Sequence, residues 1–275
     1  MSFYTSLSGL KSAQTDLGVI SNNVANANSY GFKKSRALFS DVLSASPTQS
    51  SKTRMGQGTR LNVVLQQFTQ GALESTDKAT DLAIAGEGFF VTKSLSGRQE
   101  VTFTRNGAFE INNNGQVVDQ RGSVLQLLPV DANGEVTGTT LADAIPFEVP
   151  ANAPGNPAIP LVNVTINAEG LVTAAFADGS FELVGSVALA SFTAQSGLRP
   201  IGDSHFQSSG DSGEALVNVA TTGSLGAIRS GALERANVDV TEELVALISA
   251  QRNFQANAKA IETASNMTQT IVSIR

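Results

Sequence analysis

The sequence lacks cysteine and tryptophan altogether, and it contains a single histidine among 275 residues. Without cysteine, the chain can form neither a disulfide framework nor a thiolate metal site. His205 is the one residue available to a Ser-His-Asp arrangement, and its surroundings contain no G-x-S-x-G turn. We therefore expect a structural role for His205, at the surface or half-buried, and the sequence indicates no catalytic residues.

Charged residues are also scarce, at 15% of the chain, and the formal net charge is −6. No cluster of Lys and Arg offers a track for phosphates, so the acidic balance argues against nucleic-acid binding. No apolar run approaches the ~20 residues that a membrane-spanning helix needs. Polar residues also interrupt the amino-terminal segment, which therefore lacks the apolar core of a signal peptide. These absences predict no membrane insertion, and either a cytoplasmic location or export without a cleaved signal peptide.

Metal and cofactor motifs are missing as well. Residues 131–134 (DANG) begin like a calcium loop but lack the later ligands, including a Glu at the twelfth place. The glycine pairs at 56–58 and 86–88 lack the strand-to-helix context of nucleotide-binding loops. We expect a hairpin turn at 131–134, and neither a metal nor a cofactor.

An apolar repeat of seven residues marks both ends of the chain. Its members are Phe3, Leu10, Leu17 and Val24, with Ile20 at an alternate step, and Val240, Leu247, Phe254 and Ile261, with Leu244 at an alternate step. This spacing predicts a helix at each end. Thr241, followed by two glutamates, is expected to cap the second helix, which then runs to Ser273 without Gly or Pro.

Polar residues interrupt both apolar stripes, so each helix is marginal alone in water. One interpretation is an ordinary helical hairpin whose polar positions face water. The other, which we favour, is that the two ends pair with each other and then pack against other subunits.

The middle of the chain, from about residue 61 to 225, changes to a two-residue period. Short alternating runs are separated by Asn-Gly and Asp-Gly turns, which is typical of antiparallel β structure. Strands are expected at 101–104, 109–111, 116–118, 124–130, 162–166, 171–176, 181–184 and 187–192. The expected fold class is α+β, with terminal helices pairing as a coiled-coil-like core and a central antiparallel β domain.

The domain boundaries follow from these changes of pattern. We expect a terminal helical domain at 1–30 plus 240–275, a connector region at 31–80 plus 226–239, and a β-rich outer domain at 81–225. The Ser/Thr/Gln/Gly-rich stretch from Ser44 to Gly58 is interpreted as a linker, and Gly31 as a hinge after the first helix. Residues 70–75 (QGALES) resemble residues 230–235 (SGALER), which predicts two adjacent strands or turns at the root of the β domain.

Three blocks of the sequence resemble the bacterial flagellar axial proteins, the rod and hook group. They are residues 8–33 (SGLKSAQTDLGVISNNVANANSYGFK), 81–91 (DLAIAGEGFFV) with 103–109 (FTRNGAF), and 230–261 (SGALERANVDVTEELVALISAQRNFQANAKAI). Residues 129–138 (PVDANGEVTG) and the carboxyl-terminal segment look like those of hook members. The chain is short for a hook protein, however, and its linker is similar to that of distal rod members. We favour a hook subunit, with a distal rod subunit as the alternative.

The resemblance implies a structural subunit, without enzymatic activity, that polymerises into a helical tube transmitting motor torque to the filament. It implies partners in further copies of the chain, the rod and hook-filament junction proteins, the hook cap and the flagellar type III export apparatus. The expected location is the bacterial flagellum, as extracellular hook or basal body.

The resemblance also implies which residues make the polymerisation core. These are Leu10, Leu17, Ile20, Asn22, Asn23, Val24, Asn26, Leu244, Leu247, Phe254 and Ile261. The asparagines at 22, 23, 26 and 28 would then form hydrogen bonds with neighbouring subunits. The alternative is a solvated face at the end of a short helix.

Overall fold

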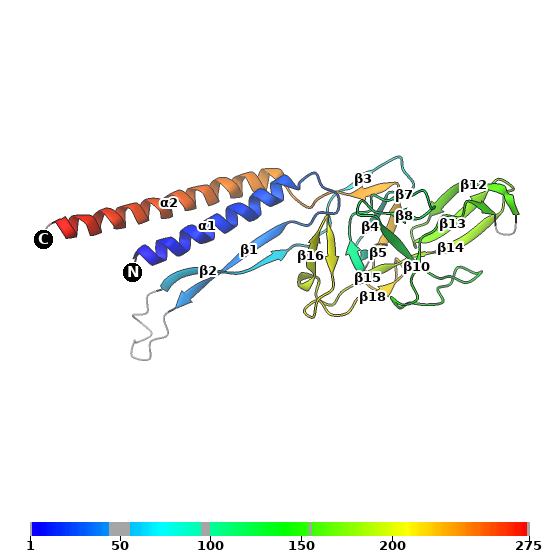
Figure 1. The fold of residues 1–275 in the computed structure, drawn as a ribbon, viewed down its shortest axis with the longest axis horizontal. Coiled ribbons are helices and arrows are strands. Elements are labelled where there is room, and N and C mark those ends of the chain that lie inside the picture. The colour runs from blue at the N-terminus through cyan, green and yellow to red at the C-terminus, as the bar shows by residue number, and fades with distance from the viewer. Residues whose placement is uncertain (1, 44–55, 95–99, 154–155, 274–275) are drawn as a thin grey trace. The chain divides into compact units, whose positions relative to one another are not determined.

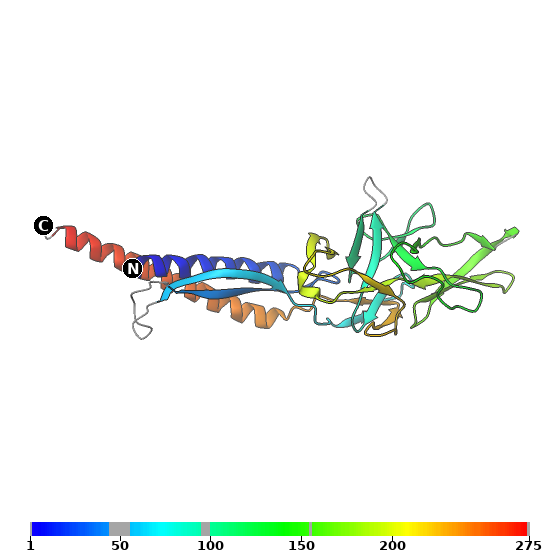
Figure 2. The ribbon, with the colours of Figure 1, turned by 90° about the horizontal axis from the view of Figure 1, so that it is seen from below.

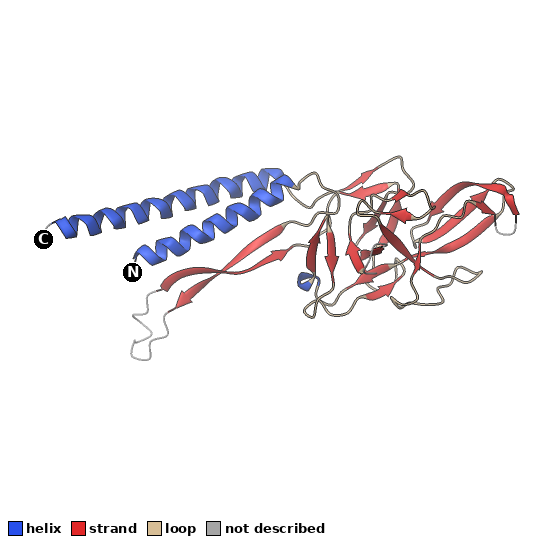
Figure 3. Ribbon diagram, viewed as in Figure 1, coloured by secondary structure: helices blue, strands red, loops and turns tan. Residues whose placement is uncertain are grey.

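The structure, a computed structural model, describes residues 2–43, 56–94, 100–153 and 156–273. The expected linker therefore lies mostly outside the described residues, Ser44 included. The chain forms two compact units (Figure 3): a helical unit of Met1–Ala27, Lys34–Gln67 and Val238–Arg275, and a β unit of Asn28–Lys33 and Phe68–Asn237.

The helical unit contains two helices and a hairpin. Its elements are α1 (Ser2–Ala25), α2 (Val240–Ser273), β1 (Ser35–Leu43) and β2 (Gly56–Gln66). The helices run antiparallel, side by side, and the β1–β2 hairpin lies along α1 (Figures 1 and 2). Gly58 lies within the hairpin's return strand, β2, instead of ending a linker. Its φ of +113° and its approach to Ser8 leave no room for a Cβ atom.

The cap of α2 differs from the sequence expectation. The Asp239 carboxylate accepts hydrogen bonds from the backbone amides of Thr241 (2.8 Å) and Glu242 (3.2 Å). Its backbone carbonyl also accepts the first helical bond, from the Glu243 amide at 3.0 Å. Asp239 is therefore the N-cap, and Thr241 lies within the first turn, because the aspartate stands immediately before the helix and can reach its free amides.

The β unit is built almost entirely of short antiparallel strands. In chain order these are β3 (Leu73–Ser75), β4 (Leu82–Ala85), β5 (Phe89–Ser94), β6 (Val101–Thr104), β7 (Glu110–Ile111), β8 (Val117–Val118), β9 (Ser123–Leu128), β10 (Ile145–Pro146), β11 (Asn152–Ala153), β12 (Asn156–Ile166), β13 (Leu171–Phe176), β14 (Phe181–Val187), β15 (Leu189–Ser191), β16 (Arg199–Gly202), β17 (His205–Gln207), β18 (Leu216–Asn218), β19 (Ala227–Ser230) and β20 (Ala232–Glu234), with a 3-10 turn, η1 (Gln195–Gly197). The expected fold class is thus confirmed.

One large sheet organises this unit. Its main path runs β11-β12-β13-β14-β9-β5-β6-β17-β16, and separate pairs join β19 to β4 and β20 to β3. The core beneath the sheet includes edge-to-face rings such as Phe89 with Phe206 (5.8 Å) and Phe103 with Phe192 (4.8 Å). Burial of these aromatic side chains supplies much of the drive to fold a unit so poor in charge.

The internal sequence echo is a strand pair. β20 and β3 pair antiparallel, with Leu233 opposite Glu74 and Glu234 opposite Leu73, as the repeated sequence predicts. The hairpin turn expected at 131–134 is also present. There the Asp131 carboxylate accepts backbone amides of Asn133 and Glu135, each at 2.9 Å. These bonds, above all the one from Glu135, lower the pKa of Asp131 below its usual value.

His205 is buried, which corrects the expectation of a surface or half-buried position. Its Nε2 lies 2.7 Å from Oδ2 of the buried Asp119, and its Nδ1 lies 2.8 Å from the Asp203 carbonyl oxygen. The other Asp119 oxygen accepts the amides of Arg121 and Ser123. The pair joins β17 to the turn between β8 and β9, so its role is structural.

Replacing His205 with alanine is expected to destabilise the β unit by about 2 kcal/mol, because Asp119 then loses a buried partner. Urea unfolding of the purified full chain measures this loss. Swimming at low temperature should stay close to normal, and complete loss of motility with the fold intact would contradict a purely structural role.

Candidate functional site

Two features of the structure are candidate sites: the contact between α1 and α2 in the helical unit, here called the seam, and a buried ion cluster in the β unit. In the seam, the expected positions Leu10, Leu17, Val24, Leu247, Phe254 and Ile261 are half-buried, Ile20 is buried and Leu244 is exposed. Small and polar residues occupy the most buried seam sites, among them Ala13, Asn23 and Ala250. Small and polar side chains are thus buried where the two helices meet, whereas larger apolar side chains of the seam stay partly exposed.

Asn23 joins three elements of the helical unit. Its Oδ1 accepts the Ser35 amide at 2.9 Å, and its Nδ2 donates to the Ser35 carbonyl at 2.9 Å. Nδ2 also donates to the Glu243 carboxylate at 3.1 Å. The Asn23 side chain is only 2% exposed. Asparagine is unfavourable inside a helix, but here its hydrogen bonds connect α1 to β1 and to α2.

The other asparagines use their side chains differently. Asn26 donates through Nδ2 to the Asn22 carbonyl at 2.9 Å, where α1 ends, and thereby pairs one of the helix's last carbonyl groups. Asn22 is exposed, and in the β unit Asn28 accepts a bond from Arg235 at 3.3 Å. Asn23 therefore serves contacts within the subunit, whereas Asn22 is open to contacts outside it.

Apolar side chains are exposed over the helical unit. α2 extends past the amino-terminal end of α1 (Figure 1), because Gly9 contacts Asn257 and Asn23 contacts Glu243 in the antiparallel pairing. Exposed large apolar residues lie on this extension and on other faces of the unit: Phe3, Tyr4, Phe39, Leu43, Leu61, Val63, Val64, Val240, Leu244, Val245, Ile248, Met267, Ile271 and Val272. The number of exposed large apolar side chains makes the helical unit a candidate interaction surface.

The ion cluster lies in the β unit next to the places where the chain enters and leaves it. Nζ of Lys33 lies 2.7 Å from Oε1 of Glu234, and Nη1 of Arg105 lies 3.4 Å from Oε2. Lys33 also donates to the Thr69 carbonyl at 2.9 Å, and Glu234 accepts the Gly71 amide at 2.8 Å. All three charged side chains are at most 1% exposed.

The cluster holds two positive charges against one negative charge. Burial lowers the pKa of Lys33, an effect that Glu234 opposes and Arg105 reinforces. Burial likewise lowers the pKa of Arg105, opposed by Glu234. Arg105 gains a further contact from the Phe89 ring, 5.2 Å from its guanidinium carbon. Glu234 is thus the residue on which both bases depend.

Gly31 lies next to the ion cluster. Its φ is +66°, and an added Cβ would lie 2.4 Å from the Asn106 backbone nitrogen. Its amide donates to the Glu234 carbonyl at 2.8 Å. The left-handed conformation expected from sequence is present, but α1 already ends at Ala25. Gly31 therefore permits close packing of the chain on residues 105–106 and does not terminate the helix.

Lys33, Arg105 and Glu234 were not among the residues that the sequence indicated. The available signal was a charged residue placed inside an apolar pattern, as Glu234 follows Ala232-Leu233 in the echo motif. Within the ranges that the structure describes, no helix is long and apolar enough to span a membrane. The same residues contain no group of three His, Asp or Glu side chains arranged to hold a metal. The seam and the ion cluster provide hydrogen bonds, ion pairs and apolar contacts.

Comparison with known proteins gives three family matches in chain order. Residues 3–33 match the family described as "Flagella basal body rod protein", and residues 83–174 match "Flagellar hook protein FlgE/F/G D1 domain". Residues 229–274 match "Flagellar basal body rod FlgEFG protein C-terminal". A structure titled "Crystal structure of Helicobacter pylori flagellar hook protein FlgE2" aligns with 66% of this chain and 47% of that one, at 16% identity and a TM-score of 0.24, which is too low to support an argument.

Relatives with rod names align along their whole length. The "Flagellar basal-body rod protein FlgG" of Bacillus subtilis (strain 168) is 32% identical over 100% of this chain and 98% of that protein. The protein of the same name from Caulobacter vibrioides is 33% identical over 98% of each. The "Flagellar hook protein FlgE" of Escherichia coli (strain K12) is 25% identical over 100% of both. The chain therefore belongs to the family of flagellar basal-body rod and hook proteins.

Proposed function

We propose that this protein is a structural subunit of the flagellar rod, in the position of the distal rod. The observation that carries the proposal is the length of the matches. The Bacillus subtilis rod protein aligns over 285 positions with this chain of 275 residues. The Escherichia coli hook protein needs 413 positions, so it carries a long segment that this chain lacks.

This proposal replaces the hook subunit that the sequence favoured. The hook-like segment at 129–138 is a short turn between two strands in the structure. A turn of this kind is common in antiparallel folds and distinguishes the two members weakly. The overall length and the higher identity to rod proteins are more informative, since they draw on the whole chain.

The structure supports a polymerising subunit in two ways. The exposed apolar residues of the helical unit would be buried by neighbouring copies, which removes their contact with water. The seam positions Leu247, Phe254 and Ile261 then belong to a polymerisation core, together with the exposed Leu244 and Asn22. The ion cluster of Lys33, Arg105 and Glu234 lies near the points where the chain passes between the β unit and the helical unit. The buried cluster would hold these chain segments in place when force is applied to the helices.

The family is one of structural flagellar proteins and not an enzyme family. For this chain we propose that further copies form the rod, that adjoining rod and hook proteins contact the two ends of the rod, and that the flagellar type III apparatus exports it. Its location is then the basal body.

The test replaces the gene in its flagellated host. Cells without it should be non-motile, and electron micrographs of their basal bodies should show a truncated rod with no hook. Reintroducing the gene of a rod relative should restore swimming more effectively than that of a hook relative. Basal bodies with a complete rod and a missing hook would instead favour the hook subunit.

A charge in the seam should block polymerisation. Phe254→Asp would place a carboxylate among apolar side chains of the helical unit, with no partner to compensate its desolvation. We expect at least about a tenfold rise in the protein concentration needed for assembly, equivalent to ~1.4 kcal/mol. Sedimentation of the full chain measures this concentration. Gln255→Asp, at the neighbouring exposed position, is the matched control and should assemble normally.

Amide exchange should show that Phe254→Asp leaves the β unit folded. Tubes of normal length from this variant at the normal concentration would contradict the place of Phe254 in the polymerisation core.

A further inference from the structure

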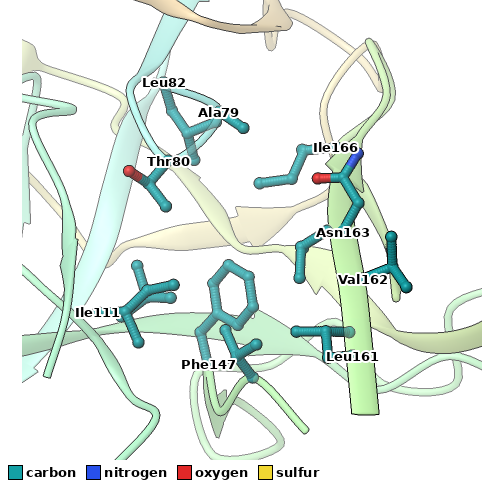
Figure 4. Close-up of a pocket in the computed structure, with 12 residues that line it drawn as sticks. Ala79, Thr80, Leu82, Ile111, Phe147, Leu161, Val162, Asn163 and Ile166 are labelled. Atoms are coloured by element: carbon teal, nitrogen blue, oxygen red, sulfur yellow. The ribbon is translucent and has the colours of Figure 1, made fainter. Parts of the chain in front are cut away.

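The β unit carries an open apolar pocket of about 230 Å³ that neither the ion cluster nor the helices use. Figure 4 shows Ala79 and Thr80 on one side and residues of β12, including Ile166, on the other, with Phe147 between them. None of its lining residues is charged. Ile111 and Val162 stand at the pocket with 49% and 67% of their surface exposed. An engineered apolar cavity of about 150 Å³ already admits benzene, so this pocket is large enough for a phenyl ring.

The same unit exposes such a ring. Phe181, at the start of β14, is 75% exposed, whereas Phe89, Phe103, Phe192 and Phe206 of the same unit are packed in its core. It is held on a rigid strand by its pairing with Ala175. Exposing the apolar surface of Phe181 to water is unfavourable in free energy. Burial of the ring against another molecule would remove this penalty.

The strand register places the ring on the face of the β12–β14 ribbon opposite to part of the pocket lining. Ala175 stands opposite both Phe181 and Asn163, so these three residues share one face. Val164 and Ile166, which line the pocket, stand opposite Ala174 and Val172, which are buried. Successive residues of a strand point to opposite faces, so Phe181 stands on the face opposite to Val164 and Ile166. Asn163 lines the pocket from the same face as Phe181, at the edge of the recess.

We propose that Phe181 of one copy of this chain inserts into the pocket of the next copy. The proposal rests on the self-assembly proposed above and names a contact for it in the β unit. Because Phe181 is not one of the residues that line the pocket, the projection and the recess are different places on one copy, and their contact is heterologous. A heterologous contact can repeat from copy to copy without closing. A second copy is the occupant because the molecule itself carries an exposed apolar ring that matches its own apolar pocket, and the self-assembly proposed above requires contacts between copies.

Cross-linking in assembled flagella tests the contact. The chain has no cysteine, so introduced thiols are the only ones in this chain. The double variant Phe181→Cys/Ile111→Cys is produced in the host in place of the normal gene, and purified basal bodies are treated with a short bis-maleimide. We expect a ladder of dimers, trimers and longer chains, and at most dimers from either single variant.

The matched control is Leu216→Cys/Ile111→Cys, because Leu216 is as exposed as the ring but does not line the pocket. It should give at least about tenfold less cross-linked product, the difference expected for a specific contact of ~1.4 kcal/mol. A ladder of equal strength from this control, or none from Phe181→Cys/Ile111→Cys in swimming cells, overturns the proposal.

A mixing experiment distinguishes the two sides of the contact. Phe181→Asp spoils the projection and Ile111→Asp spoils the recess, so each purified full-length variant should self-associate at least about tenfold more weakly than the normal chain. Their mixture should form one-to-one heterodimers, since one intact projection still meets one intact recess. Normal tubes from Phe181→Asp overturn the docking contact and leave the rod function standing. Complete rods in cells without the gene would overturn the rod function itself.

Discussion

Replacing Glu234 with alanine is expected to destabilise the β unit by about 3–5 kcal/mol, the usual cost of removing one partner from a buried ion pair. Glu234 is the acceptor for both Lys33 and Arg105, at 2.7 and 3.4 Å, and for the Gly71 amide. Without it, two buried positive charges face each other and one backbone amide loses its partner. Arg105 cannot lose its proton at neutral pH, so the penalty cannot be avoided by neutralisation.

Amide hydrogen exchange of the full chain measures this loss. Protection of the buried amides of Phe90 and Leu125 should fall by about a hundredfold or more, at ~1.4 kcal/mol for each factor of ten. Glu74→Ala is the matched control, because Glu74 lies on the paired strand and its partner Arg235, at 3.7 Å, is half-exposed. That variant should change stability by no more than about 1 kcal/mol. Equal protection in the two variants would show that the cluster does not anchor the unit.

The pH dependence provides an independent check on the same cluster. Burial places the Lys33 pKa below 10.5, so between that lowered value and 10.5 the folded chain binds fewer protons than the unfolded chain. Stability from this group therefore rises with pH in that window. In Glu234→Ala the Lys33 charge has lost its counterion, so its pKa should fall further and the stability deficit should become smaller as the pH rises from neutral toward 10.5.

Asn23→Asp is expected to destabilise the helical unit by about 2–4 kcal/mol and to abolish swimming. The substitution removes the two bonds that Nδ2 donates, to the Ser35 carbonyl and to Glu243. It also places a second carboxylate beside Glu243, where the present distance is 3.1 Å. Two buried carboxylates this close cannot both remain ionised without a large penalty.

Circular dichroism at 222 nm of the full chain follows this effect, because the long described helices all belong to the helical unit. Asn22→Asp is the matched control: it makes the same change at the adjacent, exposed position and should shift stability by about 0.5 kcal/mol or less. Adding Glu243→Gln to Asn23→Asp should restore most of the loss, since the glutamine amide then donates to the aspartate. A failure of this rescue, with Asn22→Asp equally damaging, would exclude the hydrogen bonds as the cause.

The sequence by itself determined the features that depend on near neighbours along the chain. A seven-residue apolar repeat places side chains on one face of a helix, so both terminal helices could be predicted. Two-residue alternation between Asn-Gly and Asp-Gly turns likewise predicted the antiparallel strands. The repeated GALE motif predicted that residues 70–75 and 230–235 lie next to each other where the chain enters and leaves the β domain, and β3 and β20 do pair there.

The hairpin of β1 and β2 was not predicted. Much of β2 is exposed, including Leu61, Val63 and Val64, so the burial of β2 shows no two-residue alternation, although that of β1 largely alternates. A strand without a buried face carries little sequence signal, and its place is decided by what it packs against. Asp239 replaced Thr241 as the helix cap for a related reason, since both are good capping residues and only the chain's path into the helix selects one.

Only the tertiary structure decided the ion cluster, the role of Asn23 and the place of Phe181. Lys33 and Glu234 are separated by 201 positions, and Asn23 and Glu243 by 220. Local periodicity cannot report on contacts between such distant residues, because it records only which face a residue occupies and not what lies opposite. The sequence therefore determined the elements and their family, whereas the folded chain determined which polar groups stabilise each unit and which apolar groups remain open to a neighbour.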